Sequence, residues 1–120
     1  MKKILLLLLL LAGCTSRTKE KGPTIAYFSK NEIDITTVQM QKVNSTSISY
    51  IGYEQQVLVI VFVEDYDRCY VYNDVPADIY HNLLDSESIG SYFNSNIKGK
   101  YKSNRIDGVE VVNGHIKYIW

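Results

Sequence analysis

Residues 57–63 read Val-Leu-Val-Ile-Val-Phe-Val, an unbroken apolar run in which most side chains are β-branched. Such a run indicates a strand that is buried on both of its faces. Because side chains alternate along a strand, Val57 and every second residue after it point to one face, and Leu58, Ile60 and Phe62 point to the other. The rest of the chain must therefore supply two covering layers.

Strand-like sequence lies on either side of this run. Residues 48–53 and 69–72 are rich in β-branched and aromatic residues, and a short polar loop at 64–67 precedes the second of them. Short links favour an antiparallel meander of about three strands. Upstream, residues 24–28 and 35–43 could each supply a further short strand.

Two short helices are predicted after the meander. Pro76 suits a first helical turn, and apolar residues then recur at helical spacing as far as Leu84. Ser88 is predicted to cap a second helix, in which apolar residues fall four apart and which Gly99 ends.

The C-terminal stretch 108–120 predicts a β-hairpin. Two apolar segments flank Asn113-Gly114, which is the strongest short turn signal for a hairpin. The fold class is therefore α+β: a small antiparallel meander, two short helices and a C-terminal hairpin. If the helices cover one face of the central strand, we expect residues 24–43 and the hairpin to cover the other, unless a partner does.

The N-terminus carries a secretory signal. Lys2 and Lys3 precede the aliphatic run 4–11, and Leu11-Ala12-Gly13-Cys14 follows. The run is far shorter than the ~20 residues of a membrane-spanning helix. The stretch resembles the bacterial lipoprotein signal, which implies removal of residues 1–13 and membrane attachment through diacylglyceryl and N-acyl groups on Cys14. A permanent transmembrane anchor and a plain export signal are the alternatives.

The resemblance also bears on location. The residue after the cysteine is Thr15 and not aspartate, which in such lipoproteins favours the outer membrane over the inner one. We therefore expect a cell-membrane or outer-membrane lipoprotein, with its domain in the periplasm or at the cell surface. Residues 14–23 are predicted to be the lipidated cysteine and a flexible tether, and residues 24–120 a single domain.

Composition limits the function classes. Without the signal the chain keeps 11 basic and 13 acidic residues, a net charge of −2, whereas strongly nucleic-acid-binding proteins are usually basic. With Cys14 lipidated, Cys69 is a lone thiol. We expect it to be a buried strand residue, and a reactive or intermolecular thiol is the alternative.

The middle of the chain resembles the KTSC domain, a short module named for the C-terminus of some lysyl-tRNA synthetases. The resemblance covers residues 43–101. Its elements are Ser45-Thr46-Ser47-Ile48, Ile51-Gly52-Tyr53, Leu58, Ile60, Phe62, Tyr70-Val71-Tyr72, Val75-Pro76, Tyr80, Leu83, Ser88-x-Gly90-x-x-Phe93-Asn94, Ile97 and Tyr101. The family usually has a tight glycine turn where this chain has the acidic loop 64–68. It has no established activity, although its synthetase context has suggested RNA binding.

Two surfaces are candidates for binding. Tyr70 and Tyr72 lie on one face of a strand, where they could stack bases or instead pack under the helices or the hairpin. The other candidate is a basic cluster near Tyr101, which could hold phosphate groups or be a solvated helix end that complements the helix dipole. Its basic residues are Lys98, Lys100, Lys102 and Arg105.

Catalytic and metal signals are weak. Glu64-Asp65-x-Asp67 is a poor calcium candidate, and His81 and His115 sit in no ligand-spaced pattern. No nucleophile elbow, zinc spacing or phosphate loop occurs in the sequence. The sequence therefore predicts a non-enzyme without cofactor or metal that binds an envelope protein or peptide. Phage exclusion is one such role, and RNA binding through the Tyr-x-Tyr face is the alternative function.

Overall fold

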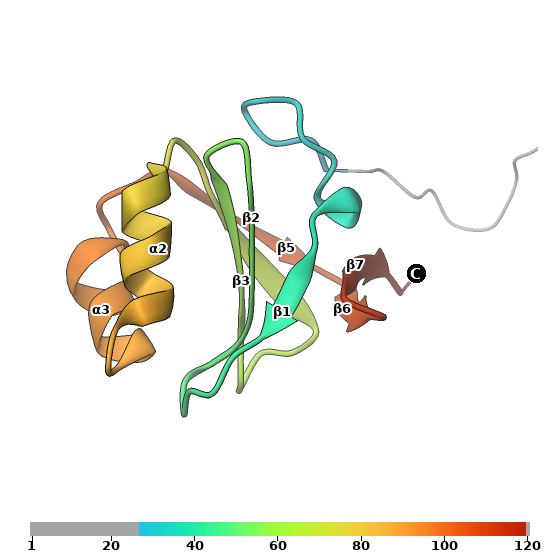
Figure 1. Ribbon diagram of the computed structural model, residues 1–120. Coiled ribbons are helices and arrows are strands. Elements are labelled where there is room, and N and C mark those ends of the chain that lie inside the picture. The colour runs from blue at the N-terminus through green and yellow to red at the C-terminus, as the bar shows by residue number, and fades with distance from the viewer. Residues whose placement is uncertain (1–26, 120) are drawn as a thin grey trace, which may run out of the picture.

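The centre of the fold is a five-stranded antiparallel sheet, seen in a computed structural model that describes residues 27–119 (Figure 1). The strand order is β1-β2-β3-β4-β5, so the apolar run forms the middle strand. The bounds are β1 (Met40–Lys42), β2 (Ile48–Glu54), β3 (Val57–Phe62), β4 (Arg68–Tyr72) and β5 (Ser103–Asp107).

Two helices, α2 (Ala77–Asp85) and α3 (Ile89–Asn96), cover one face of the sheet (Figure 1). The Ser88 side chain caps α3, as the sequence predicted, whereas Pro76 is the N-cap of α2 and lies just before the first helical turn in which it was predicted. Leu58 and Ile60 of β3 are fully buried beneath this layer. The other fully buried or nearly buried members of this core are Ile48, Ile51, Tyr72, Val75, Leu83, Phe93 and Ile97.

The opposite face is covered by residues 27–40 and the C-terminal hairpin. The first of these segments contains a 3₁₀ turn, η1 (Ile35–Thr37), and the hairpin consists of β6 (Val109–Val112) and β7 (His115–Tyr118). Asn113 and Gly114 have φ values of 52° and 79°, which are the left-handed values that a type I′ hairpin turn requires. The buried residues of this second core are Ile33, Ile35, Val38, Met40, Val57, Val59, Val61, Cys69, Val71, Val109 and Ile116.

The expectation that the chain covers both faces of its own central strand is thus confirmed. Three of the four valines of the run lie in the second core, while Val63, beyond the end of β3, is 44% exposed. The doubly buried part of the run therefore ends at Val61, two residues before the apolar sequence does.

The predicted count of about three meander strands was too low. The sheet contains five strands, because β1 and β5 form its two edges. Strand β5 reads Ser-Asn-Arg-Ile-Asp and is largely exposed, so it has none of the apolar alternation that marks a half-buried strand. Near the N-terminus, Phe28 makes only an isolated bridge with Asp34, and no longer strand is formed there within the described residues.

Among the described residues, 27–119, the helices fall short of the length and hydrophobicity that a bilayer-spanning helix needs.

The hairpin is predicted to be essential for stability. Ile116 is only 2% exposed and packs in the core beneath β3, so Ile116→Ala should lower the free energy of unfolding by about 2–5 kcal/mol in urea titrations. Deleting residues 108–120 should expose that face and cause aggregation. The matched control is Lys117→Ala, which removes an exposed neighbour in the same strand and should leave stability unchanged within ~0.5 kcal/mol. Equal stabilities of the two variants would contradict the role of the hairpin.

Candidate functional site

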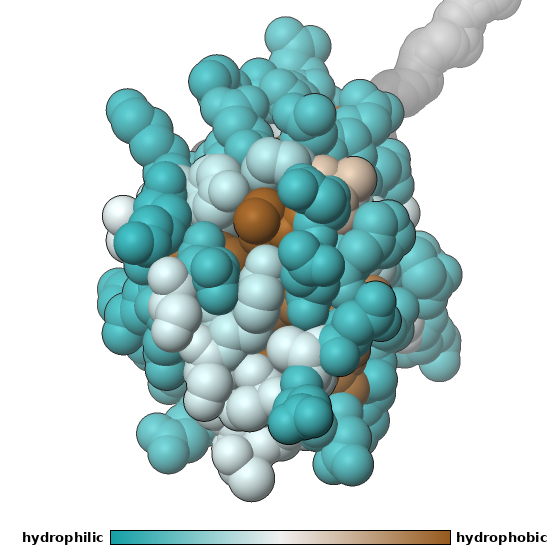
Figure 2. All heavy atoms as spheres, turned by 60° about the vertical axis from the view of Figure 1, so that its left-hand side comes forward, coloured by the Kyte–Doolittle hydropathy of each residue, from teal (hydrophilic) through white to brown (hydrophobic). Residues whose placement is uncertain are grey.

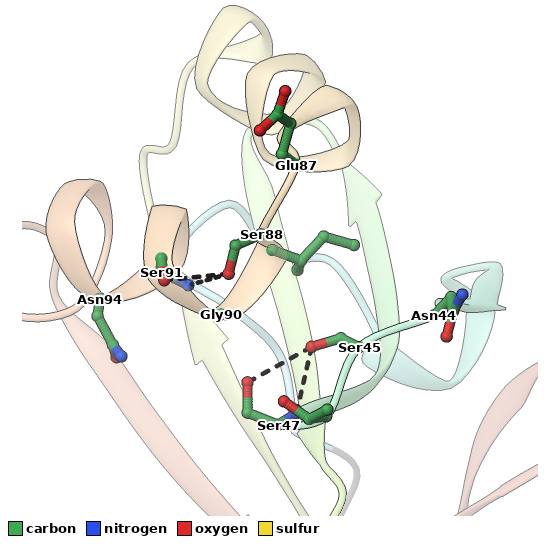
Figure 3. Close-up of a pocket in the computed structure, with 10 residues that line it drawn as sticks. Asn44, Ser45, Ser47, Glu87, Ser88, Gly90, Ser91 and Asn94 are labelled. Atoms are coloured by element: carbon green, nitrogen blue, oxygen red, sulfur yellow. Dashed lines mark hydrogen bonds between the residues drawn. The ribbon is translucent and has the colours of Figure 1, made fainter.

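A polar hollow of about 390 Å³ lies between the loop that precedes β2 and the first turns of α3 (Figure 3). One wall consists of residues 44–47, and the other of residues 87–91 with Asn94. These two segments are some forty residues apart in the sequence and meet only because α3 folds back over the sheet. We refer to this site as the serine hollow.

Local hydrogen bonds shape the first wall. The Ser45 hydroxyl accepts from the backbone amides of Ser47 and Ile48, at 3.2 Å each, which holds the loop against the start of β2. The Ser47 carbonyl accepts from the Val63 amide at 2.9 Å, which ties the same loop to the chain just after β3. Residues of this type favour such local turns because their hydroxyls compete with regular backbone pairing.

The second wall is the capped start of α3. The Ser88 hydroxyl accepts from the Ser91 amide at 3.3 Å and bonds to the Ser91 hydroxyl at 3.0 Å. This is the usual N-cap arrangement, in which a side-chain oxygen satisfies an orphan amide of the first turn. Both residues line the hollow, and their hydroxyls point toward each other (Figure 3).

Gly90 brings the two walls into contact. A Cβ atom at this position would collide with the Ser47 hydroxyl oxygen, so the helix approaches the loop as closely as only a glycine allows. The two walls are therefore in contact at this point.

The chemistry of the lining is that of hydrogen bonding without an activated nucleophile. Its polar groups are hydroxyls, amides and backbone, and its one ionisable side chain is Glu87. The serine hydroxyls make their described hydrogen bonds to one another and to backbone, and none of these bonds involves a basic side chain. A serine nucleophile needs an adjacent base. The hollow is thus suited to holding a polar group.

A smaller hollow of about 290 Å³ adjoins the first. It is lined by Thr46 and Ser47, which the two hollows share, together with Phe62, Glu64 and Asp65. Seen from the helix side, the surface of the molecule is mostly polar, with small apolar areas between the polar side chains (Figure 2).

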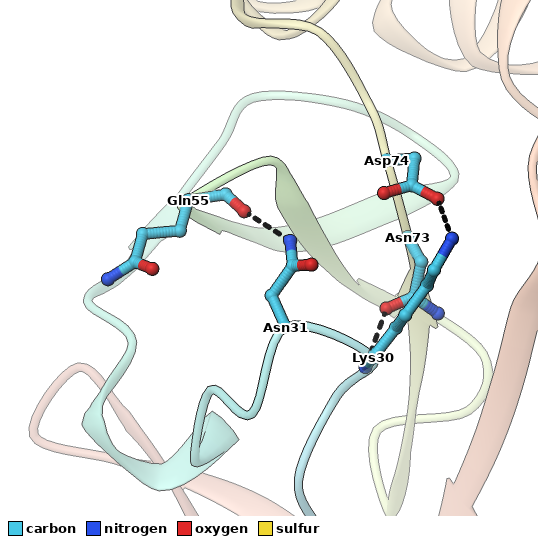
Figure 4. Close-up of polar contacts among 5 residues, drawn as sticks. All are labelled: Lys30, Asn31, Gln55, Asn73 and Asp74. Carbon is cyan, nitrogen blue, oxygen red and sulfur yellow. Dashed lines mark hydrogen bonds and ion pairs between the residues drawn. The ribbon is translucent and has the colours of Figure 1, made fainter.

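A third hollow, of about 490 Å³, lies where the N-terminal segment meets the end of β4 and the start of β5. Three contacts fasten that segment (Figure 4): Lys30 Nζ pairs with Asp74 at 2.7 Å, the Lys30 amide donates to Asn73 at 3.3 Å, and the Asn31 amide group donates to the Gln55 carbonyl at 2.8 Å. The lysine and the aspartate here neutralise each other, and both are largely exposed.

Comparisons with known proteins match this architecture. A family model for the KTSC domain matches residues 44–101. A protein of Tsukamurella paurometabola is 32% identical over 66 residues, which cover 53% of this chain and 96% of the relative. The crystal structure of a KTSC domain protein from Yersinia pestis has 35% identity and a TM-score of 0.55, covering 58% of this chain and 99% of that one.

The chain belongs to the KTSC domain family.

Both walls of the serine hollow lie within the KTSC module, residues 44–101. Ser45-Thr46-Ser47 and Ser88-x-Gly90 carry part of the family resemblance, but they were not predicted to form a site. The signal that could have identified the site is their composition, since both stretches are rich in small hydroxyl residues and the second also contains Gly90. Neither has a hydrophobic period that would reveal its place in the fold.

The predicted tyrosine pair packs under the helices. Tyr72 is 5% exposed and packs edge-on against the Phe93 ring, with 5.5 Å between the ring centroids. Tyr70 is half-buried against Phe62, with 5.3 Å between the ring centroids. Burial, with a contribution from neighbouring Tyr70, raises the pKa of Tyr72 to about 12. Tyr72 is therefore a packing residue and is not available as a stacking platform, while Tyr70 is partly buried at the margin of the same core.

The predicted basic cluster is divided between different surroundings. Lys98 and Lys100 are exposed in the turn after α3, while Tyr101 is half-buried against the helix-side core. Lys102 lines the third hollow, and Arg105 pairs with Asp107 at 3.4 Å on β5. None of these residues lines the serine hollow.

Other candidate groups are also placed by the structure. Cys69 is fully buried, and burial, followed by the Asp107 charge, raises the pKa of its thiol to about 12, so it acts as a small apolar residue. His81 is exposed on helix α2 and His115 lies on β7, on opposite sides of the sheet. Within residues 27–119, no three His, Cys, Asp or Glu side chains converge. Cys14 lies outside the described residues.

The contact between the walls of the serine hollow predicts a measurable coupling. Gly90→Ala gains roughly 1 kcal/mol of helix propensity but forces the Ser47 hydroxyl to move. In a Ser47→Ala background only the Ser47 Cβ remains nearby, at 3.6 Å, an ordinary contact. The change in the free energy of unfolding caused by Gly90→Ala, measured by urea titration, should therefore be more favourable by about 1 kcal/mol in the Ser47→Ala background than in the wild type. Additive effects would show that the walls do not touch.

Proposed function

We propose that this chain is a lipid-anchored cell-envelope protein whose KTSC module binds a protein or peptide partner without catalysing a reaction. Binding takes place in the serine hollow. The observation that carries this proposal is the pairing of two walls, distant in sequence, around a hollow lined by unactivated hydroxyl and amide groups.

The anchor is supported by the sequence around Cys14. A cationic start, a short aliphatic run and Leu-Ala-Gly-Cys form a lipoprotein signal, and two or more acyl chains hold a protein firmly on a membrane. The folded domain is compatible with this arrangement. The described residues cover both faces of their own sheet, so the lipid on Cys14 would attach the domain to the membrane. Thr15 favours the outer membrane, with the domain in the periplasm or at the cell surface.

The partner is an envelope protein or peptide, because polar hollows of this size recognise hydrogen-bonding groups such as an exposed chain segment.

One biological role of such binding is phage exclusion, in which the anchored protein occupies a phage receptor. Expression of the protein in a sensitive host would then reduce phage adsorption, and expression of a Cys14→Ala variant would not.

RNA binding, the alternative that the lysyl-tRNA synthetase context suggests, has less support. It relied on a stacking face formed by Tyr70 and Tyr72, and Tyr72 is buried beneath α3. The negative net charge of the chain without its signal also weakens binding to a phosphate backbone. We therefore do not favour it as a second function.

The anchor is tested by lipid labelling. Radiolabelled palmitate should enter the wild-type protein and not Cys14→Ala, and the label should appear in the envelope fraction. Equal folding of the two proteins, checked by circular dichroism, is the control. An unlabelled product in the soluble fraction of the cell would show that the signal was misread and that nucleic acid again deserves testing.

The binding site is tested by photo-crosslinking in cells. A photoreactive residue in place of Thr46, which lines both neighbouring hollows, should give a discrete adduct with an envelope protein. Adding Ser91→Phe, which fills the hollow from the opposite wall, should remove most of the adduct. The same probe at exposed Lys117, on the hairpin, is the control. An adduct that is equally strong at both positions, or that is insensitive to Ser91→Phe, would argue against the hollow.

A further inference from the structure

The two edge strands of the central sheet differ in how their outer backbone groups are covered. At the β1 edge, the Met40 amide donates to the Gly114 carbonyl at 2.7 Å, so the turn of the C-terminal hairpin covers the start of that strand. At the other edge, β5 is paired with β4 on one side, and no described strand lies on its outer side. An uncovered edge strand presents a row of unpaired backbone groups that another strand can bind.

The register shows which groups these are. The Asn73 amide donates to the Lys102 carbonyl and the Gly108 amide to the Asp67 carbonyl, both at 3.0 Å. Hydrogen-bonded positions alternate along an antiparallel pair, so Asn104 and Ile106 face β4 in the same way. The backbone amides and carbonyls of the residues between them therefore point to the open edge. These residues are Ser103, Arg105 and Asp107.

We propose that a second copy of this chain binds the open edge, with the two β5 strands antiparallel and a two-fold axis at Ile106. This register places Arg105 of each copy opposite Asp107 of the other, and the two Ile106 residues opposite each other. The sheets of the two copies then form one continuous sheet. The proposal does not depend on the lipid anchor or on a ligand in the serine hollow.

Charge complementarity selects this register. With the axis at Ile106, two Arg–Asp pairs face each other across the strands, an arrangement that stabilises a sheet. With the axis one residue earlier, at Arg105, the Arg105 residues of the two copies would lie opposite each other. Like charges directly opposite are unfavourable. The two charged side chains are available on the surface, since those of Arg105 and Asp107 are 54% and 53% exposed.

The side chains at this edge are already arranged for the pairing. Within one copy, the Asp107 carboxylate lies 3.4 Å from Arg105 Nε and 3.3 Å from Arg68 Nε. The carboxylate is thus held at the edge, where the arginine of the second copy can reach it. On the other face of β5, half-buried Ile106 packs against the second core, the one beneath the hairpin. Ile106 of the second copy would extend this apolar surface across the two-fold axis.

The test uses charge exchange in the full-length protein, purified in detergent and analysed by sedimentation and native mass spectrometry. The wild type should be a dimer. Arg105→Asp and Asp107→Arg each bring like charges together, so each alone should weaken association at least tenfold. An equimolar mixture of the two variants should form heterodimers, because each supplies the charges that the other needs. The double variant R105D/D107R should dimerise with itself.

Lys100→Asp is the matched control, since it makes the same charge change at an exposed position in the turn before β5 and should leave the dimer intact. Circular dichroism checks the fold of each variant. A monomeric wild type, or a dimer that both single variants leave unaffected, would overturn the proposal. A mixture of single variants that fails to associate would also overturn it, since the register would then be wrong.

Amide hydrogen exchange of the unmodified protein provides a test that requires no variant. The amides of Asn104 and Ile106, which face β4, should be protected at every protein concentration. Those of Arg105 and Asp107 should become protected only as the concentration rises and the second copy binds. Fast exchange of these two amides at all concentrations would contradict the dimer. Protection that does not change with concentration would instead show that residues of the same chain cover the edge.

Discussion

The burial of β3 on both faces is the constraint on which the rest of the structure depends. Five consecutive residues, Val57–Val61, are at most 2% exposed, so a sheet with only one covered face would leave three valines in water. The KTSC module supplies the helix layer, and segments outside it, residues 27–40 and the hairpin, supply the other. The family module in this chain is thus completed by its own flanking sequence.

The same constraint positions the serine hollow. Helix α3 must lie close to the sheet to bury Phe93 and Ile97 over β3 and β4, and this brings its capped start against the loop that precedes β2. Gly90 permits the approach, and Ser47 limits it. The hollow therefore arises where core packing brings a loop and a capped helix start together, and its hydroxyls are oriented by the local hydrogen bonds of those two segments.

How much the sequence could predict depended on the kind of signal. The strand at residues 57–62, the Asn113-Gly114 turn and the Ser88 cap follow strong local rules, and the structure confirms all three. Strand β5 could not be predicted in this way, because an edge strand with exposed polar side chains has no apolar period. The serine hollow was missed for a related reason. Its residues belong to loops and caps, and only the tertiary packing of α3 brings Ser45 and Ser47 near Ser88 and Ser91.

The treatment of the two sheet edges shows how a small domain handles unpaired backbone. Hairpin residues cover the start of one edge through Gly114, and the same hairpin buries Val109 and Ile116 beneath β3, so one element both completes the core and protects part of a strand. The β5 edge has no such cover in the described structure, but it carries Arg105 and Asp107 on consecutive outward-facing positions. Charges on an edge strand disfavour pairing with apolar strands. An alternating pair of opposite charges does more, because it disfavours most registers and partners while leaving one self-complementary arrangement open.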